Sequence, residues 1–179
     1  MKKVIYISAI VLLSTFKSFS QEKSFAVKLN PLSLAFITPN LQFEKSISET
    51  STVQLGLAFA NFKVLEQKFG FVQVTPEFRK YFGEEGAMRG FYVGPYLRLI
   101  SGGYTEGNSD TKIKYNTFGG GAVLGFERAT QGGFVFDIFA GPNYGSTNFK
   151  QNVVEDDIPT RGTGNGFGVR FGIALGFAK

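Results

Sequence analysis

The stretch GFGVRFGIALGFAK, from Gly166 to Lys179, decides between the fold classes open to this chain. Its even-numbered positions hold only Gly and Ala, apart from one cation, Arg170. Its odd-numbered positions up to 177 are all bulky and apolar, namely Phe167, Val169, Phe171, Ile173, Leu175 and Phe177. Because successive side chains of a β-strand point to opposite faces, this pattern predicts a strand with one apolar face and one narrow, partly polar face.

The same two-faced alternation recurs in seven earlier segments, at residues 24–36, 41–47, 52–62, 69–82, 90–101, 112–128 and 133–145. The first segment changes phase at Asn30 and Pro31, which predicts a bulge. Short turns are expected to alternate with longer polar loops at 63–68, 102–111 and 146–165. No 3.6-residue period appears after residue 20. The chain is therefore predicted to be all-β, an eight-stranded antiparallel up-and-down barrel whose last strand pairs with residues 25–29.

The N-terminus has the pattern of an export signal. Lys2 and Lys3 precede an apolar run from Val4 to Leu13, and the small residues Ser18 and Ser20 follow. This pattern predicts a cleavable signal peptide at 1–20 and a barrel domain at 21–179. The run is shorter than the roughly 20 residues of a membrane-spanning helix. Residues 1–20 contain three lysines and no acid, so without them the net charge of +5 falls to +2 and nucleic acid is not an expected partner.

Single charged residues interrupt the face that is otherwise rich in Gly, Ala and Tyr. A Lys or Arg that faces lipid at the middle of a bilayer costs about 2–4 kcal/mol, so these side chains are predicted to point into the barrel. The interior of eight strands is just wide enough for side chains to fill, and opposite charges there would pair and close it. The predicted lumen charge network is Lys28, Glu44, Glu77, Arg79, Arg98, Glu127, Asp137 and Arg170.

The opposite face is predicted to meet lipid. A soluble lipocalin-like barrel would instead turn it toward a ligand cavity, but the other face is poor in Lys and Glu for a solvated exterior. Aromatic residues at strand ends, among them Tyr81, Tyr104 and Tyr115, are expected to form interfacial girdles. The predicted lipid-facing residues are Val53, Leu55, Leu57, Phe59, Phe91, Val93, Leu97, Leu124, Phe126, Phe134, Phe136, Phe171, Ile173, Leu175 and Phe177.

The sequence offers little for catalysis. It contains no His and no Cys, which excludes the commonest general base and all thiol chemistry. The glycine-rich stretches 119–125 and 162–168 match no phosphate-binding loop. We therefore expect no enzyme, with no catalytic residues, no cofactor and no metal site.

Three segments carry a family resemblance: VTPEFRKYFG (Val74–Gly83), RGFYVGPYLR (Arg89–Arg98) and KLNPLSLAFITPNLQFEKSI (Lys28–Ile47). With them the chain resembles an uncharacterised family of small Bacteroidetes-type outer-membrane β-barrel proteins, whose general architecture is similar to OmpA and OmpX. The resemblance implies an eight-stranded transmembrane barrel in the outer membrane. It brings no catalytic residue and no known ligand.

These observations together predict a monomeric barrel of the cell outer membrane with a structural or interaction role. Its expected partners are membrane lipid, the outer-membrane assembly machinery during biogenesis, and a protein of unknown identity at the long loops. Two alternatives are a small pore and a soluble lipocalin-like carrier of a hydrophobic ligand.

Overall fold

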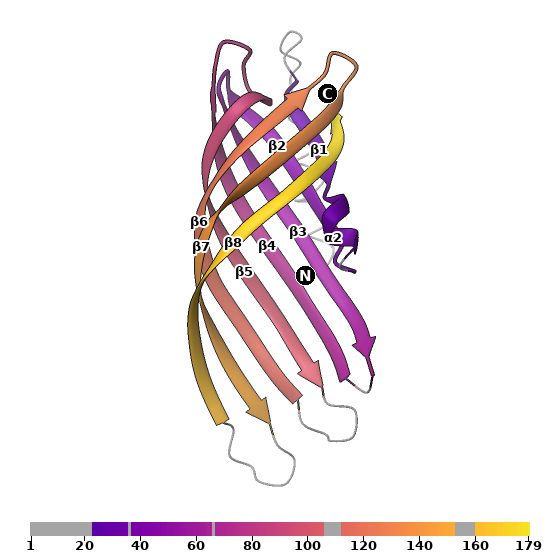
Figure 1. The fold of residues 1–179 in the computed structure, drawn as a ribbon, viewed down its shortest axis with the longest axis vertical. Helices are drawn as coiled ribbons and strands as arrows, with labels where there is room; N and C mark the ends of the chain where they lie inside the picture. Colours follow the sequence, from indigo (N-terminus) through magenta and orange to yellow (C-terminus); the bar gives the residue numbers. More distant parts are fainter. Residues whose placement is uncertain (1–22, 36, 66, 106–111, 153–159) are drawn as a thin grey trace, which may run out of the picture.

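The strands form one closed antiparallel barrel in which each strand pairs with its sequence neighbours and β8 closes on β1 (Figure 1). The computed structural model describes residues 23–35, 37–65, 67–105, 112–152 and 160–179. The elements are β1 (Phe25–Leu29), α2 (Pro31–Ala35), β2 (Asn40–Ser48), β3 (Ser51–Val64), β4 (Gln67–Phe82), β5 (Arg89–Thr105), β6 (Lys112–Ala129), β7 (Phe134–Asn152) and β8 (Thr160–Ala178).

Within these residues, the prediction of an all-β fold with eight antiparallel strands is confirmed. The seam is also confirmed, since Val27 lies opposite Phe177 and Leu29 opposite Leu175. Main-chain hydrogen bonds extend this seam to the last residue, where the Lys179 amide donates to the Phe25 carbonyl at 2.8 Å. The beginning of β1 and the end of β8 therefore lie together at the end of the barrel that carries the β2–β3, β4–β5 and β6–β7 turns, here called the short-turn end.

The predicted long loops are mostly wrong where the structure describes them, while positions 66, 106–111 and 153–159 lie outside the described residues. Residues 146–152 continue β7 and residues 160–165 begin β8, while β5 runs on to Thr105. Leu65 and position 66 alone separate β3 from β4, and Leu65 has a φ of 55°. Backbone pairing between neighbouring strands continues through segments whose polar and Gly-rich composition is typical of loops. The strand pairs β3–β4, β5–β6 and β7–β8 are consequently long. They extend to the end of the barrel opposite the short-turn end, which is here called the hairpin end (Figure 1).

The predicted bulge at Pro31 is also wrong, because the chain forms a single helical turn, α2, between β1 and β2. The Asn30 side-chain oxygen accepts a hydrogen bond from the Ser33 amide at 3.2 Å, and so caps the first turn. Proline suits the position that follows such a cap, because its fixed φ is helical and its missing N–H needs no partner. Leu32 and Leu34, which are predicted to continue the strand, are therefore helical, and position 36 lies outside the described residues.

The wall of the barrel has unequal height. Only residues 175–178 of β8 pair with β1, and only residues 51–58 of β3 pair with β2. Strands β3 to β8 continue past this level toward the hairpin end, whereas β1 and β2 stop and are joined there by α2 (Figure 1). Lys28 and Glu44 lie on the complete part of the wall, on β1 and β2, whereas Arg170 lies on β8 beyond the residues that pair with β1.

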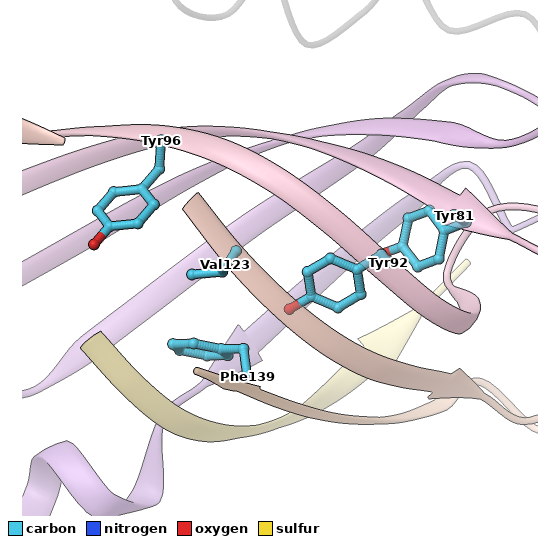
Figure 2. Close-up of a cluster of buried hydrophobic side chains, with 5 residues drawn as sticks. All are labelled: Tyr81, Tyr92, Tyr96, Val123 and Phe139. Atoms are coloured by element: carbon cyan, nitrogen blue, oxygen red, sulfur yellow. The ribbon is translucent and has the colours of Figure 1, made fainter. Parts of the chain in front are cut away.

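The core lies inside the barrel and is small. Tyr81, Tyr92, Tyr96, Val123 and Phe139 form one buried cluster in the lumen (Figure 2). A second cluster at the short-turn end contains Met88, which is fully buried beneath Ala26, Ala129 and Val135. Among the described residues, no helix has the length and hydropathy needed to cross a membrane.

Candidate functional site

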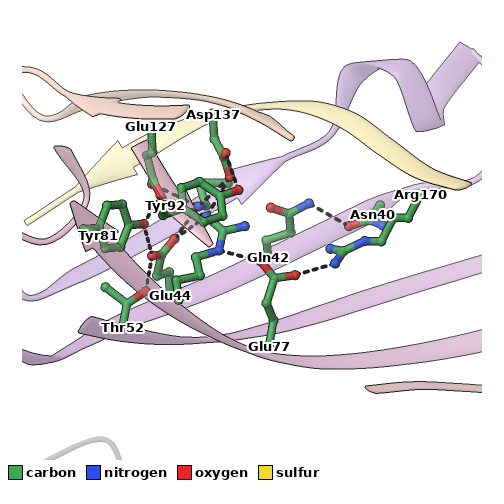
Figure 3. A network of polar contacts seen from close by, with 12 residues as sticks. Asn40, Gln42, Glu44, Thr52, Glu77, Tyr81, Tyr92, Glu127, Asp137 and Arg170 are labelled. Carbon is green, nitrogen blue, oxygen red and sulfur yellow. Dashed lines mark hydrogen bonds and ion pairs between the residues drawn. The ribbon is translucent and has the colours of Figure 1, made fainter. Parts of the chain in front are cut away.

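The most distinctive chemical feature is an ionic cluster inside the lumen, here called the lumen network (Figure 3). Its charged members are Lys28, Glu44, Glu77, Arg79, Glu127, Asp137 and Arg170. They come from β1, β2, β4, β6, β7 and β8, always from the inward-facing positions of the alternation. Eight strands enclose so little space that inward charges from opposite walls come into contact.

Strand register places two carboxylates side by side at the start of the cluster. Glu127 of β6 lies directly opposite Asp137 of β7. Like charges in this position repel each other, so the pair requires cations nearby. Lys28 provides one, because its Nζ lies 3.0 Å from Glu127 Oε1 and 3.1 Å from Asp137 Oδ2. The same Nζ also contacts Glu44.

Arg79 is the centre of the lumen network. Its Nη1 lies 2.9 Å from Glu127 Oε2, 2.8 Å from Asp137 Oδ2 and 3.2 Å from Glu44 Oε2. Its Nε donates to Glu77 Oε1 at 2.6 Å. The side chains of all these residues are fully buried. Burying charges is costly, and only good geometry and further hydrogen bonds compensate for that cost.

Hydroxyl groups supply those further hydrogen bonds. Tyr81 Oη donates to Glu44 Oε1 at 2.7 Å and also contacts Glu127. Tyr92 Oη donates to Asp137 Oδ1 at 2.9 Å, and Thr52 Oγ1 donates to Glu44. The Tyr92 ring also lies under the Arg79 guanidinium, 4.3 Å from ring centre to Cζ, which is a cation–π distance.

A second layer continues the lumen network toward the hairpin end. Arg170 forms an ion pair with Glu77, and its guanidinium lies 4.5 Å from the centre of the Tyr96 ring and 4.7 Å from that of Phe139. Arg98 is set apart from the carboxylates. Its Nη2 donates to the amide oxygen of Asn143 at 3.2 Å. Seven of the eight predicted lumen charges thus form one connected cluster, and Arg98 lies beside it.

Glycine on the neighbouring strands makes room for the large side chains of this cluster. A Cβ added to Gly125 would lie 2.3 Å from Tyr92 Cζ, and one added to Gly176 would lie 2.8 Å from Lys28 Cγ. Real Cβ atoms do not come so close to their neighbours. The small residues that alternate with the charges in the sequence are therefore part of the packing of the lumen.

Sequence reasoning missed the roles of Tyr81, Tyr92 and Thr52. Tyr81 is predicted to lie in an interfacial girdle, but it points inward and is 2% exposed. Tyr104 and Tyr115 also face inward, where Tyr104 packs on Phe69 at 5.0 Å and Tyr115 packs on Gly102. The alternation itself could have identified these inward residues. Each of them lies on the same face of its strand as the charged residues.

The predicted lipid-facing residues all lie on the outer side of the wall. The most exposed are Phe91 at 68%, Leu124 at 68%, Phe171 at 67% and Phe177 at 71%. Others of the set, such as Val93 and Ile173, are half-buried between their neighbours. The outside of this barrel is therefore apolar while its inside is ionic, the reverse of a water-soluble barrel.

The chemistry that the lumen network can perform is limited. Its carboxylates are already held by Lys28 and Arg79. Among the described residues, no group of three or more His, Cys, Asp or Glu side chains is arranged to hold a metal ion. What the arrangement does is join β1, β2, β4, β6, β7 and β8 across the lumen.

Comparison with known proteins gives one finding. The model of a family described as "Protein of unknown function (DUF3575)" matches residues 7–163. No curated protein and no solved structure matches the chain.

Proposed function

The chain belongs to the family described as a protein of unknown function (DUF3575), and we propose that it is a small integral outer-membrane β-barrel with a lumen closed by internal ion pairs. The observation that carries this proposal is the reversed polarity of the wall. Leu124 and Phe171 are exposed on the outside, whereas Arg79 and Asp137 are fully buried inside. Lipid is the solvent that accepts such an outer face.

The shape of the outer face also supports a lipid environment. An apolar groove of about 610 Å³ is lined by Leu32 of α2 and by residues of β4 to β8, among them the outward Phe91, Leu124 and Phe171. Hydrocarbon offers no hydrogen-bond partner to an unpaired strand edge. A closed barrel has no such edge where all its strands are present. The outward apolar residues of β8 run from Phe177 to Phe171, past the residues 175–178 that pair with β1, and we propose that the bilayer surrounds this stretch of the wall.

We further propose that residues 1–20 are a signal peptide removed on export and that the assembly machinery inserts the mature barrel into the cell outer membrane. Its architecture would then be of the OmpA and OmpX type, as in small Bacteroidetes-type barrels. The charge pattern at 1–20 and the strand number support this view. The role is structural or interactional, with the β3–β4, β5–β6 and β7–β8 hairpins as the part available to a partner.

The lumen network argues against the two alternatives. A pore needs an open cross-section, yet Lys28, Glu44, Arg79, Glu127 and Asp137 are fully buried where they meet. A soluble carrier of a hydrophobic ligand needs apolar side chains around an internal cavity. Here the charged residues occupy the inside and the apolar ones the outside.

Fractionation tests the proposal most directly. The full chain, expressed with its own N-terminus in a Gram-negative host, should be recovered in the outer membrane and migrate faster on a gel before boiling than after. A matched variant that lacks residues 2–20 should stay in the cytoplasm. A chain that purifies as a stable monomer without detergent would refute the membrane location.

A further inference from the structure

The charged groups that contact one another in the lumen network do not balance. Three cations contact four acids, namely Lys28, Arg79 and Arg170 on one side and Glu44, Glu77, Glu127 and Asp137 on the other. Arg98 also lies in the lumen, but among the described residues it contacts the Asn143 amide and no acid. If all four acids were ionised, the cluster would bury one uncompensated negative charge, which is strongly unfavourable.

The hydroxyl group of Tyr81 lies between two of these acids. Its Oη is 2.7 Å from Glu44 Oε1 and also contacts Glu127 Oε2. A phenol has one hydrogen, so Tyr81 can donate to only one of the two oxygens. The other contact is a hydrogen bond only if that acid carries a proton and donates it to Tyr81 Oη. Two hydrogen bonds at Tyr81 therefore require one protonated acid.

Glu127 is the acid with fewer donors and the less favourable neighbour. Four side chains donate to Glu44, two to each oxygen, namely Thr52, Tyr81, Lys28 and Arg79. Apart from the shared hydroxyl, only Lys28 and Arg79 donate to Glu127. Glu127 also lies directly opposite Asp137, and like charges in this position are destabilising. A proton on Glu127 removes that repulsion.

The two central cations also have fewer hydrogens than contacts. Arg79 Nη1 carries two hydrogens but lies within 3.2 Å of three carboxyl oxygens, on Glu44, Glu127 and Asp137. Lys28 Nζ carries three hydrogens and contacts the same three acids, so it has none to spare. One contact at Arg79 Nη1 therefore receives no hydrogen, as expected if its oxygen belongs to a protonated acid.

We propose that the lumen network binds one proton at neutral pH, held on Glu127 Oε2 and donated to Tyr81 Oη, which in turn donates to Glu44 Oε1. The groups that face this proton are Lys28 of β1, Glu44 of β2, Arg79 and Tyr81 of β4, and Asp137 of β7. Three cations then balance three carboxylates. The proton lies inside the barrel, so its presence does not depend on whether lipid or water surrounds the outside.

Infrared spectroscopy tests the proton directly, with the full mature barrel in detergent micelles at pH 7. A protonated carboxyl group has a carbonyl stretch that is separate from the bands of a carboxylate. The wild type should show this stretch, and Glu127→Gln should lack it. Glu85→Gln is the matched control and should keep it, because Glu85 is a half-exposed partner of Arg128. A wild type without the band would overturn the inference.

The pH dependence of unfolding gives a second readout. An unfolded Glu side chain has a pKa of about 4.3, so it is ionised above about pH 5.5 and folding must take up a proton there. The chain contains no His, the side chain that ordinarily titrates in this range. Between about pH 5.5 and pH 7, the unfolding equilibrium constant of the wild type should therefore rise tenfold per pH unit relative to that of Glu127→Gln. Relative to Glu85→Gln it should stay constant.

Asp137→Asn distinguishes the two opposite acids. It removes an ionised partner of Lys28 and Arg79, so it should destabilise the barrel more than Glu127→Gln at pH 7 and leave the infrared band in place. Loss of the band in Asp137→Asn but not in Glu127→Gln would overturn the assignment to Glu127. A constant ratio of unfolding constants for Glu127→Gln would overturn it too. So would a Glu127→Gln variant that fails to fold at pH 7, because a neutral amide replaces a neutral acid of the same shape.

Discussion

The Nη1 atom of Arg79 lies 2.8 Å from Oδ2 of Asp137, and this ion pair joins β4 to β7 across the lumen. Both side chains are fully buried, and the same guanidinium reaches Glu44, Glu77 and Glu127. Arg79 therefore connects residues that lie far apart around the ring of strands. Its contacts make the lumen network one unit rather than a set of separate pairs.

Replacing Arg79 with Met should strongly destabilise the barrel, because it leaves buried carboxylates without their main cation. Breaking a buried ion pair from one side typically costs about 3–5 kcal/mol of the free energy of unfolding. Urea unfolding in detergent micelles, followed by gel migration without boiling, measures this change. Arg128→Met is the matched control, because Arg128 and Glu85 are about half exposed, and it should cost no more than about 1 kcal/mol. Equal losses in the two variants would show that the buried cluster does not stabilise the fold.

Removing the hydroxyl of Tyr92 should also destabilise the barrel, though less. Tyr92→Phe keeps the ring against Arg79 but removes the donor to Asp137 Oδ1, 2.9 Å away. A hydrogen bond to a charged group contributes about 1.5–3 kcal/mol to stability. Tyr96→Phe is the control, because Tyr96 Oη lies 3.5 Å from the Pro142 carbonyl oxygen, at the limit of hydrogen bonding. The same unfolding measurement should show the larger loss for Tyr92→Phe, and the reverse order would contradict the assigned contacts.

The alternation of residues predicts which side chains share a face, and this much of the fold follows from sequence. It assigns Glu127, Asp137 and Arg79 to the inside because side-chain parity is fixed by the pleat. It does not predict that Lys28 meets all three carboxylates Glu44, Glu127 and Asp137. These contacts depend on the tilt and stagger of the strands in the closed barrel. Tilt and stagger bring together residues that lie far apart in the sequence.

The positions of the strand ends could not be read from the sequence for a different reason. Residues 162–165 are GTGN, a composition typical of a loop and predicted to be one, yet they pair with β7 throughout. Both faces of this part of β8 are exposed, so no buried face imposes an apolar pattern on it. At Pro31 the capping contact of Asn30 with Ser33 decides for a helix, and a local contact of this kind overrides a short apolar alternation.

We expect the wild-type barrel not to conduct ions in planar bilayers. The wild-type barrel should give no stable single-channel current if the lumen network closes the cross-section as proposed. Arg79→Ser should produce channel openings, since it removes both volume and charge at the centre of that network. Arg98→Ser is the matched control, because Arg98 lies beside the cluster and contacts Asn143 instead. Steady current through the wild type, or openings in Arg98→Ser alone, would contradict the assignment of the closure to Arg79.

A charge on the outer face should block membrane insertion. Leu124 is 68% exposed on the outside of β6, so Leu124→Arg would place a cation in hydrocarbon at a cost of about 2–4 kcal/mol. The yield of heat-modifiable barrel in outer-membrane fractions should fall. Leu65→Arg is the control, since Leu65 lies in the β3–β4 turn at the hairpin end and is 89% exposed. Equal yields of the two variants would argue against lipid at Leu124.

Closure of the barrel can be tested at its seam, because the chain contains no cysteine that would interfere. Ala26 of β1 lies directly opposite Ala178 of β8. The Cβ atoms of such a pair are about 4.5–5.5 Å apart, close enough for a disulfide after a small adjustment. The variant Ala26→Cys/Ala178→Cys should therefore cross-link on oxidation, and its boiled form should migrate differently with and without reductant. Ala26→Cys/Ala174→Cys places the second thiol four residues further along the same face of β8, about 13 Å away, and should not cross-link. Cross-linking in the second variant but not the first would mean that β8 meets β1 in another register, and would shift Lys28 away from Gly176.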